Sequence, residues 1–278
     1  MIYVAAITPL GQKREINFGA AFELIDFLSA AHAGGILFFG AGGEYPALAA
    51  EERSRLIYLG TKRSRIPLLA GIGSATLDHS LNLAREARDA GASALMLPPP
   101  FFYPYRQDEI REFYLEFASQ FTGGIPVYLS QLLPPAAPIA NQTAREVLAT
   151  GCFRGIEDAT GELAAAGLPA LIANDALFAR ARCAGAAVIS SAACALPELI
   201  MALDRALAAG PRQESARLEA RLGEFLAWVD IFPQPVLIKA ATACRGIKTG
   251  PLAVPLTPAQ QRRLDEFRAW FPAWSENR

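Results

Sequence analysis

Short hydrophobic runs recur along the chain, about 20 to 35 residues apart. Within each run nearly every residue is apolar, whereas a half-exposed strand would alternate apolar and polar residues. This pattern is typical of parallel strands that are covered on both faces. The eight runs predicted as strands are Tyr3 to Ile7, Gly35 to Phe39, Ile66 to Ile72, Ala94 to Pro98, Ile125 to Ser130, Phe153 to Glu157, Ala170 to Asn174 and Ala186 to Ser190.

Amphipathic stretches separate these runs. The first begins at Asn17, a good helix cap, and places Phe18 and Phe22 at helical spacing. Two further stretches, Thr76 to Gly91 and Arg106 to Gly124, also end on glycine. Alternating strands and helices predict βαβ units with right-handed crossovers, and eight such units predict an α/β fold, a (β/α)8 TIM barrel.

After the eighth run the pattern is helical only, from about Leu196 to the end of the chain. We therefore expect a barrel over residues 1–209 and a C-terminal helical extension over residues 210–278, packed on the barrel. A single barrel needs about 250 residues, so the length of 278 residues does not require a second large domain.

The composition limits the class of partner and the compartment. Hydrophobic residues make up 52% of the chain and charged residues 19%, and the net charge of -1 gives no field that would attract nucleic acid. No basic leader and no apolar stretch of about 18 residues is present, so we expect no export or membrane segment. The four cysteines include no CxxC pair, which favours a reducing cytoplasm.

Four phrases of the sequence carry a family resemblance. In order they are "ITPL", "GAGGEYPALAAEER", "GIGSATLDHSLNLAREARDAGASALMLPPPFF" and "GAAVISSAACALPELI". From about Ile2 to Pro255 the chain resembles the dihydrodipicolinate synthase / N-acetylneuraminate lyase family. The resemblance implies a barrel with a helical extension, commonly assembled as a tetramer. It also implies a lysine that forms a Schiff base with pyruvate or another 2-keto acid before aldol cleavage, condensation or dehydration.

The position of that lysine differs in this chain. The family's phrase resembles "GIKDSSGD", and "GIEDATGE" matches it without a gap, so Glu157 takes the place of the lysine. A carboxylate cannot form an imine, because imine formation requires a nucleophilic amine. The other lysines are Lys13 in a polar loop, Lys62 near the end of a surface helix, and Lys239 and Lys248 in the helical extension, so none ends a predicted strand.

Other positions implied by the resemblance differ as well. Ser130 stands where the family has its relay tyrosine, and Pro135 falls near its substrate-binding arginine. Phe102 matches the tyrosine contributed by a neighbouring subunit, although Tyr103 and Tyr105 follow closely. The "FFYPY" cluster that contains them is either a subunit interface or a wall of the ligand site.

The family's "GTTGE" loop reads "GAGGE" here, so Ala41 and Gly42 have lost both hydroxyls. The backbone N–H groups from Gly40 to Gly43 are still placed to form a nest for an anion. We therefore expect weakened capture of a carboxylate. The ligand-contacting residues predicted on this basis are Ala41, Gly42, Gly43, Phe102, Thr160 and Ser190.

Glu157 itself has three interpretations. A barrel mouth lined by Phe101, Phe102, Leu132 and Leu133 would desolvate the carboxyl group and raise its pKa toward the range of a general acid or base. Alternatively, the carboxyl group is solvated or neutralised as a structural remnant. It could also be a ligand contact without catalysis.

Two further acidic residues are predicted to have structural roles. Asp158 alternates to the opposite side of its strand from Glu157 and is expected in the turn. Glu44 resembles the family's fixed acid and is expected to anchor a loop or helix start.

The remaining polar residues suggest no cofactor. His32 and His79, the only histidines, lie on predicted helix positions, so no metal site is expected. Ser190 and Ser191 end the eighth strand without a histidine to activate either of them. "AGIGS" lacks the longer dinucleotide fingerprint, so no nucleotide cofactor is expected.

The leading hypothesis is a cytoplasmic, homo-oligomeric barrel, dimeric or tetrameric, that binds a small carboxylic or keto-acid-like metabolite and has lost imine chemistry. A second hypothesis is an active lyase, hydratase or isomerase in which Glu157 transfers protons, assisted by Ser130 and Thr160. A third is a non-catalytic regulatory subunit of an active homologue.

Overall fold

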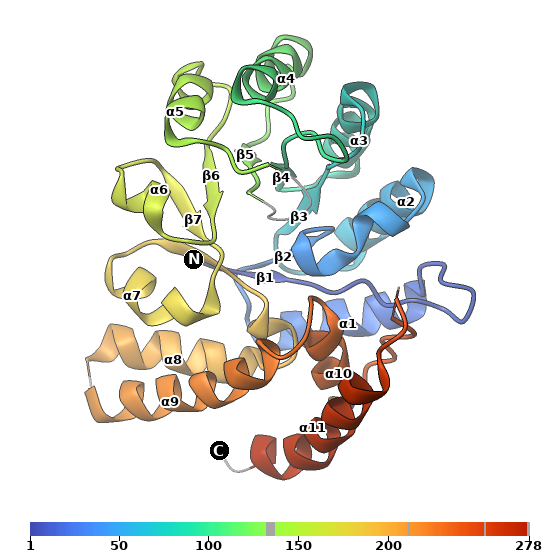
Figure 1. Ribbon diagram of the computed structural model, residues 1–278, viewed down its shortest axis with the longest axis vertical. Coiled ribbons are helices and arrows are strands. Elements are labelled where there is room, and N and C mark those ends of the chain that lie inside the picture. The colour runs from blue at the N-terminus through green and yellow to red at the C-terminus, as the bar shows by residue number, and fades with distance from the viewer. Residues whose placement is uncertain (132–136, 211, 253, 277–278) are drawn as a thin grey trace.

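Eight parallel strands form a closed barrel in the computed structural model, in the order β1 to β8 (Figure 1). The structure describes residues 1–131, 137–210, 212–252 and 254–276. The strands are β1 Ile2–Ala5, β2 Gly35–Phe38, β3 Leu68–Gly71, β4 Ala94–Leu97, β5 Val127–Leu129, β6 Gly155–Asp158, β7 Ala170–Ile172 and β8 Ala187–Ser190. Each overlaps a predicted run, although β1 begins one residue earlier, at Ile2, and β6 ends one residue later, at Asp158. The predicted (β/α)8 fold is confirmed.

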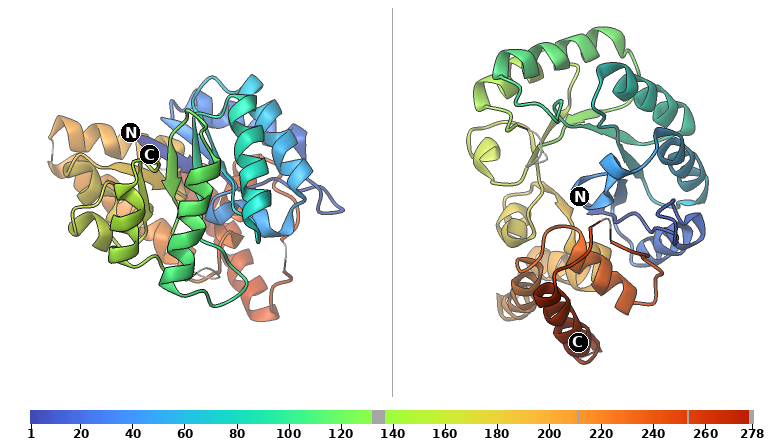
Figure 2. Two further views of the ribbon diagram at one scale, coloured as in Figure 1. Left: turned by 90° about the horizontal axis from the view of Figure 1, so that it is seen from above. Right: turned by 45° about the vertical axis from the view of Figure 1, so that its right-hand side comes forward.

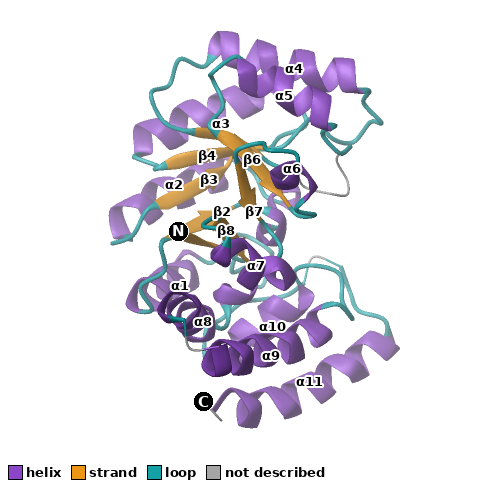
Figure 3. Ribbon diagram, turned by 90° about the vertical axis from the view of Figure 1, so that its left-hand side faces the viewer, coloured by secondary structure: helices purple, strands orange, loops and turns teal. Residues whose placement is uncertain are grey.

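A ring of helices covers the outside of the barrel (Figure 3). These are α1 Phe18–Ala30, α2 Ala50–Arg63, α3 Leu77–Ala90, α4 Gln107–Gln120, α5 Asn141–Ala149, α6 Glu162–Ala165, α7 Phe178–Cys183 and α8 Pro197–Ala209. The predicted caps are confirmed: Asn17 accepts the N–H of Ala20 at 3.1 Å, and Thr76 accepts the N–H of His79 at 3.3 Å.

Two local expectations were wrong. His32 does not belong to a helix: α1 ends at Ala30, and His32 follows it in a turn with a φ of 58°. The helix α4 stops at Gln120, before the glycines at 123 and 124, because Phe121 already has extended backbone angles.

Three more helices form the C-terminal extension: α9 Arg212–Val229, α10 Val236–Cys244 and α11 Pro258–Glu276. They gather beside α1 and α8, and the C-terminus lies at the far side of this layer from the strands (Figures 1 and 2). Phe225, Phe267 and Phe271 are fully buried between α9 and α11, with ring centroids 5.1 to 6.4 Å apart. The helical extension is present, while the boundary at residue 210 stays a prediction.

The strand residues divide between two hydrophobic cores. One core includes Ile156 and packs strands against helices. The other fills the inside of the barrel and comprises Ala5, Leu37, Leu69, Ala94, Met96, Leu171 and Ile189. Because side chains alternate along a strand, Ile156 facing outward places Glu157 inward, in register with the interior residue Leu171. Asp158 then faces outward.

No helix in the described ranges combines the length and the hydrophobicity needed to cross a membrane.

Candidate ligand site at the barrel mouth

The carboxyl group of Glu157 lies inside the barrel near the C-terminal end of β6 and is only 5% exposed. Burial raises its pKa above the usual value of 4.5, because a charged carboxylate loses its hydration there. Ser130, the first residue after β5, is fixed by a hydrogen bond from its N–H to the carbonyl of Leu97 at 2.8 Å. Its hydroxyl donates to Oε2 of Glu157, which opposes the rise in the pKa. The two residues that the resemblance aligns with the family's lysine and tyrosine are therefore in contact.

Tyr45 is a second buried group near Glu157 that the sequence did not single out. It is 6% exposed, and burial raises the pKa of its hydroxyl to about 12. The charge of Arg53 opposes this rise, and a negative charge on Glu157 would add to it. The ring of Phe101 meets the ring of Tyr45 edge-on at 5.8 Å. Tyr45 and Phe101 thus form an aromatic wall, and Tyr45 lies within electrostatic range of Glu157.

Arg53 holds this wall from behind. It is 4% exposed and donates to the carbonyls of Gly71 at 2.9 Å and Gly73 at 2.8 Å. Its guanidinium group lies 5.0 Å from the ring centroid of Tyr45 and 5.3 Å from that of Phe39. Burial lowers its pKa to about 10, so the group remains charged at neutral pH. A planar cation between two rings restricts the position of Tyr45.

The glycine-rich loop after β2 offers fewer donors than its sequence suggests. The N–H of Gly43 donates to the carbonyl of Gly40 at 2.9 Å, and the hydroxyl of Thr8 donates to the carbonyl of Gly43 at 2.7 Å. Ala41 is exposed and Gly42 is buried. One N–H of the expected nest is therefore used within the loop, and those of Gly40, Ala41 and Gly42 remain as candidate donors.

Glu44, which follows this loop, forms an ion pair with Lys239 on α10, with Oε2 and Nζ 2.6 Å apart. The side chains are 7% and 2% exposed. Glu44 is thus an anchor, as predicted. The other lysines, Lys13, Lys62 and Lys248, are exposed.

Asp158 and Thr160 lie on the outer side of the barrel. Asp158 accepts the N–H groups of Thr160 at 3.0 Å, Gly161 at 2.8 Å and Ala164 at 2.9 Å. The hydroxyl of Thr160 donates to the same carboxylate at 3.1 Å. Asp158 therefore anchors the turn into α6, as predicted, and the structure does not bring Thr160 to Glu157.

The hydroxyl of Ser190 is used within the protein. It donates to Asp175 and accepts the N–H of Ala193 at 3.0 Å. Asp175 also accepts the N–H groups of Ser191 at 3.0 Å and Ala192 at 2.9 Å. Burial raises the pKa of Asp175, and these hydrogen bonds oppose that rise. Ser190 and Asp175 fix the turn after β8, a pairing that sequence reasoning missed because Asp175 follows a different strand.

Gln131 is a further residue that the sequence did not indicate. It follows Ser130 directly, is 8% exposed, and its Oε1 has no hydrogen-bond partner in the described part of the chain. A buried acceptor without a partner is costly, so its presence beside Ser130 is consistent with a ligand donor. The predicted wall residues Leu132 and Leu133, and Pro135, lie outside the described residues.

Phe102 does not line an enclosed site within one chain. Its side chain is 80% exposed, its φ of 92° is unusual for a residue other than glycine, and its ring packs edge-on against Tyr103 at 5.0 Å. Tyr103 in turn contacts Tyr105, with centroids 6.2 Å apart. Phe102 and Tyr103 therefore project outward, whereas Tyr105 and Phe101 are half-buried against the core.

The histidines are separated. His79 is exposed on α3, and His32 occupies the turn after α1. Among the described residues, no three His, Cys, Asp or Glu side chains group in a way that could hold a metal ion.

Comparison with known proteins places this chain in a family. The model of the dihydrodipicolinate synthetase family matches residues 1–273. The chain belongs to this family. A 4-hydroxy-tetrahydrodipicolinate synthase of Alkaliphilus oremlandii is 26% identical over 282 residues, covering 95% of this chain and 96% of the relative.

Solved structures agree with the family assignment. Dihydrodipicolinate synthase of Agrobacterium tumefaciens superimposes with a TM-score of 0.84 at 28% identity, covering 95% of each chain. A prophage protein of the family from Escherichia coli K12, solved in complex with pyruvate, has a TM-score of 0.85 at 20% identity and covers 98% of this chain and 97% of its own. The second likeness concerns the fold alone.

Proposed function

We propose that this chain binds a small carboxylic or keto-acid-like metabolite at the barrel mouth and does not perform Schiff-base chemistry. The observation that carries the proposal is the buried carboxyl group of Glu157, hydrogen-bonded by Ser130. Imine formation needs a neutral amine at this end of the barrel, and a carboxyl group cannot substitute for it.

The lysines support the loss of imine chemistry. Lys13, Lys62 and Lys248 are exposed, away from the barrel interior that Glu157 occupies. Lys239 is buried, but its amine is paired with Glu44 and also donates to the carbonyl of Pro251 at 3.0 Å. An ammonium group held by a carboxylate has no lone pair with which to attack a ketone.

The polar groups at the mouth suit a ligand with an acid group and a hydrogen-bond donor. Burial favours the neutral form of Glu157, which would not repel the carboxylate of a ligand and can donate a hydrogen bond to it. The Oε1 of Gln131, which has no hydrogen-bond partner among the described residues, can accept from a hydroxyl or enol of the same molecule. Phe101 and Tyr45 supply the apolar wall.

Reductive trapping tests the proposal. The protein is incubated with pyruvate and borohydride, and intact mass is measured for the wild type and for Glu157→Lys. The wild type should gain no mass, whereas Glu157→Lys should gain one reduced pyruvate on the new amine, located by peptide mapping. A stable adduct on Lys239 or any other lysine of the wild type would overturn the loss of imine chemistry. Failure of Glu157→Lys to trap pyruvate would overturn binding of keto acids at this position.

A second candidate function is proton transfer by Glu157 in an active lyase, hydratase or isomerase. It is favoured by the raised pKa of Glu157 and by its contact with Ser130. Thr160 is not part of this candidate, because its hydroxyl is bound to Asp158. With a substrate found by metabolite screening, Glu157→Gln should abolish turnover in this case. It should change only affinity if the protein is a binder.

We also propose that the protein self-associates through the exposed side chains of Phe102 and Tyr103, with the half-buried Tyr105 beside them. Two large side chains exposed side by side, 80% and 64%, are typical of an interface core. Light scattering should give a dimer or tetramer for the wild type and a smaller species for Phe102→Glu. An unchanged mass would contradict this interface.

A cytoplasmic location is part of the proposal. All four cysteines are free, and Cys152, Cys183 and Cys244 are exposed, which suits a reducing compartment.

A further inference from the structure

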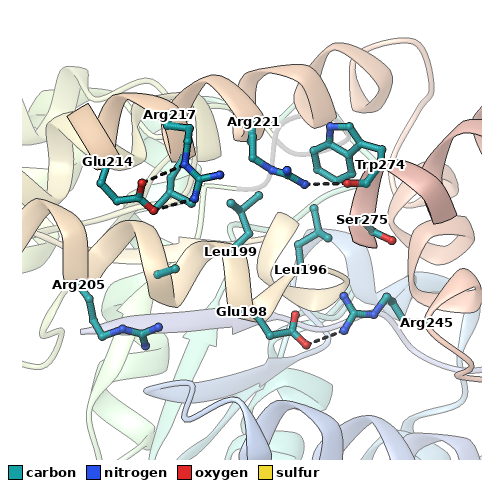
Figure 4. A pocket seen from close by; sticks show the side chains of 12 residues that line it. Leu196, Glu198, Leu199, Arg205, Glu214, Arg217, Arg221, Arg245, Trp274 and Ser275 are labelled. Carbon is teal, nitrogen blue, oxygen red and sulfur yellow. Dashed lines mark hydrogen bonds and ion pairs between the residues drawn. The ribbon is translucent and has the colours of Figure 1, made fainter. Parts of the chain in front are cut away.

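A groove of about 240 Å³ lies in the C-terminal layer, between α8, α9 and the end of α11 (Figure 4). Its floor is apolar and is formed by Leu196, Leu199, Ala202 and Leu218. The indole of Trp274 closes one end, and Arg205 lies near the other (Figure 4). None of these residues belongs to the barrel mouth, so the groove is a separate site.

The rim of the groove carries an excess of positive charge. It contains four arginines, Arg205, Arg217, Arg221 and Arg245, and two glutamates, Glu198 and Glu214. Arg217 pairs with Glu214 at 2.8 Å, and Arg245 pairs with Glu198 at 2.6 Å. Both carboxylates are thereby neutralised, and the charge of Arg205 remains at the edge of the apolar floor.

Arg205 and Arg221 have different surroundings. Arg221 donates to the carbonyl of Trp274 at 2.8 Å and lies 4.8 Å from its ring centroid, so it shapes the wall. Arg205 is exposed and has no hydrogen-bond or ion-pair partner among the described residues. A guanidinium group with all of its donors available, placed at the edge of an aliphatic groove, can bind a carboxylate in a bidentate manner.

We propose that this groove binds an amphipathic monocarboxylate, with the aliphatic chain on Leu199 and Leu218 and the carboxylate on Arg205. The volume matches about eight water-sized groups at ~30 Å³ each, which suits a chain of medium length. The charge of the rim excludes cationic amphiphiles, and the apolar floor disfavours small hydrophilic anions.

Octanoate is the probe for this site. Octanol, which lacks the charge, and acetate, which lacks the aliphatic chain, are the matched compounds. Isothermal titration of the full-length wild type should show saturable binding of octanoate and much weaker binding of the other two. The indole N–H resonance of Trp274, assigned from Trp274→Phe, should shift with octanoate. Equal binding of octanol, or no binding of octanoate at millimolar concentration, would overturn the proposal.

Variants locate the site. Arg205→Gln should weaken octanoate binding about ten-fold or more, because a charged hydrogen-bond pair is lost. Ala202→Phe should abolish binding by filling the floor. Arg268→Gln is the matched control, since Arg268 is an exposed arginine of α11 paired with Asp265 at 3.1 Å. If Arg205→Gln binds as tightly as the control, the assignment of the carboxylate is wrong.

The mouth variant Glu157→Gln should bind octanoate as the wild type does. This keeps the groove distinguishable from the site of the proposed function. Loss of octanoate binding in Glu157→Gln, with Arg205→Gln unaffected, would place the ligand at the mouth instead.

Discussion

Lys239 and Glu44 lie 195 positions apart in the sequence and form a buried ion pair of 2.6 Å. The pair joins α10 of the helical extension to the loop that follows β2. Lys239 also donates to the carbonyl of Pro251 at 3.0 Å, so a second segment of the extension is held at the same point. The extension is thereby fixed to a loop that borders the barrel mouth.

Replacing one residue of this ion pair should destabilise the folded protein. Lys239→Met leaves the carboxylate of Glu44 buried without a partner, and we expect the free energy of unfolding to fall by about 3–5 kcal/mol. Urea denaturation followed by circular dichroism measures the change. The double variant Lys239→Met with Glu44→Gln should recover part of the loss, because the unpaired charge is gone.

The surface pair Arg268–Asp265 gives the control for this experiment. Its side chains are 51% and 59% exposed, so Arg268→Met should change stability by about 1 kcal/mol or less. A similarly small effect for Lys239→Met would contradict the role of the buried pair.

The buried carboxyl group of Glu157 should make stability depend on pH. Its pKa in the folded protein lies above its usual value of 4.5, so the folded state binds more protons than the unfolded state between these two values. The free energy of unfolding should therefore fall as the pH rises through this window and stay lower above it. Glu157→Gln removes this penalty.

The difference in stability between Glu157→Gln and the wild type should accordingly be small below pH 4.5 and grow in favour of the variant as the pH rises. Thermal unfolding across the pH range measures it. Glu162→Gln, at an exposed position in the first turn of α6, is the control and should show little pH dependence. A constant difference at all pH values would show that Glu157 keeps the same pKa on unfolding.

Ser130 should lower the pKa of Glu157 by its hydrogen bond. Ser130→Ala removes a donor that favours the charged carboxylate, so the pKa of Glu157 should rise further. A carbon-13 titration of the Glu157 carboxyl group measures the shift, and the loss of stability should be about 0.5–1.5 kcal/mol. Ser119→Ala is the control, because that hydroxyl donates only to the carbonyl of Glu116 on an exposed helix face. No shift in Ser130→Ala would mean that the contact is absent in solution.

Replacement of Arg53 by lysine should destabilise the folded protein. A lysine cannot donate to the carbonyls of both Gly71 and Gly73 in the same fork geometry, and it lacks the flat face that stacks on Tyr45. Arg53→Lys should lower the free energy of unfolding by about 1–3 kcal/mol. Guanidinium denaturation checks this against Arg55→Lys, at the exposed arginine of α2 that lies 4.7 Å from the ring centroid of Phe18. Equal stability of the two variants would argue against a structural role for Arg53.

The local pattern of apolar and polar residues was sufficient to predict the fold. Uniform apolar runs predicted all eight strands, and capping side chains marked helix starts at Asn17 and Thr76. These features depend on residues that are close in the sequence, so the sequence pattern is sufficient to predict them. At His32 and Phe121 the backbone leaves the helical conformation. The local pattern therefore placed His32 in a helix wrongly and predicted the end of α4 too late.

The residues of the candidate site could be predicted only in part from the sequence. The motif around Glu157 gave its position, and strand alternation separated it from Asp158. Tyr45, Arg53, Gln131 and Asp175 were not identified, because their burial depends on which other elements pack against them. Thr160 and Ser190 were expected at the ligand, but their hydroxyls bind Asp158 and Asp175 instead.

The sequence by itself determined the order of strands and helices and the presence of an acid at position 157, since both are properties of residues and their spacing. The tertiary structure decided which distant groups meet: Ser130 with Glu157, and Lys239 with Glu44. Closure of the barrel brings Ser130 to Glu157, and packing of α10 against the loop after β2 brings Lys239 to Glu44. Burial raises the pKa of Glu157 by removing water. Neither effect is encoded in any short stretch of the chain.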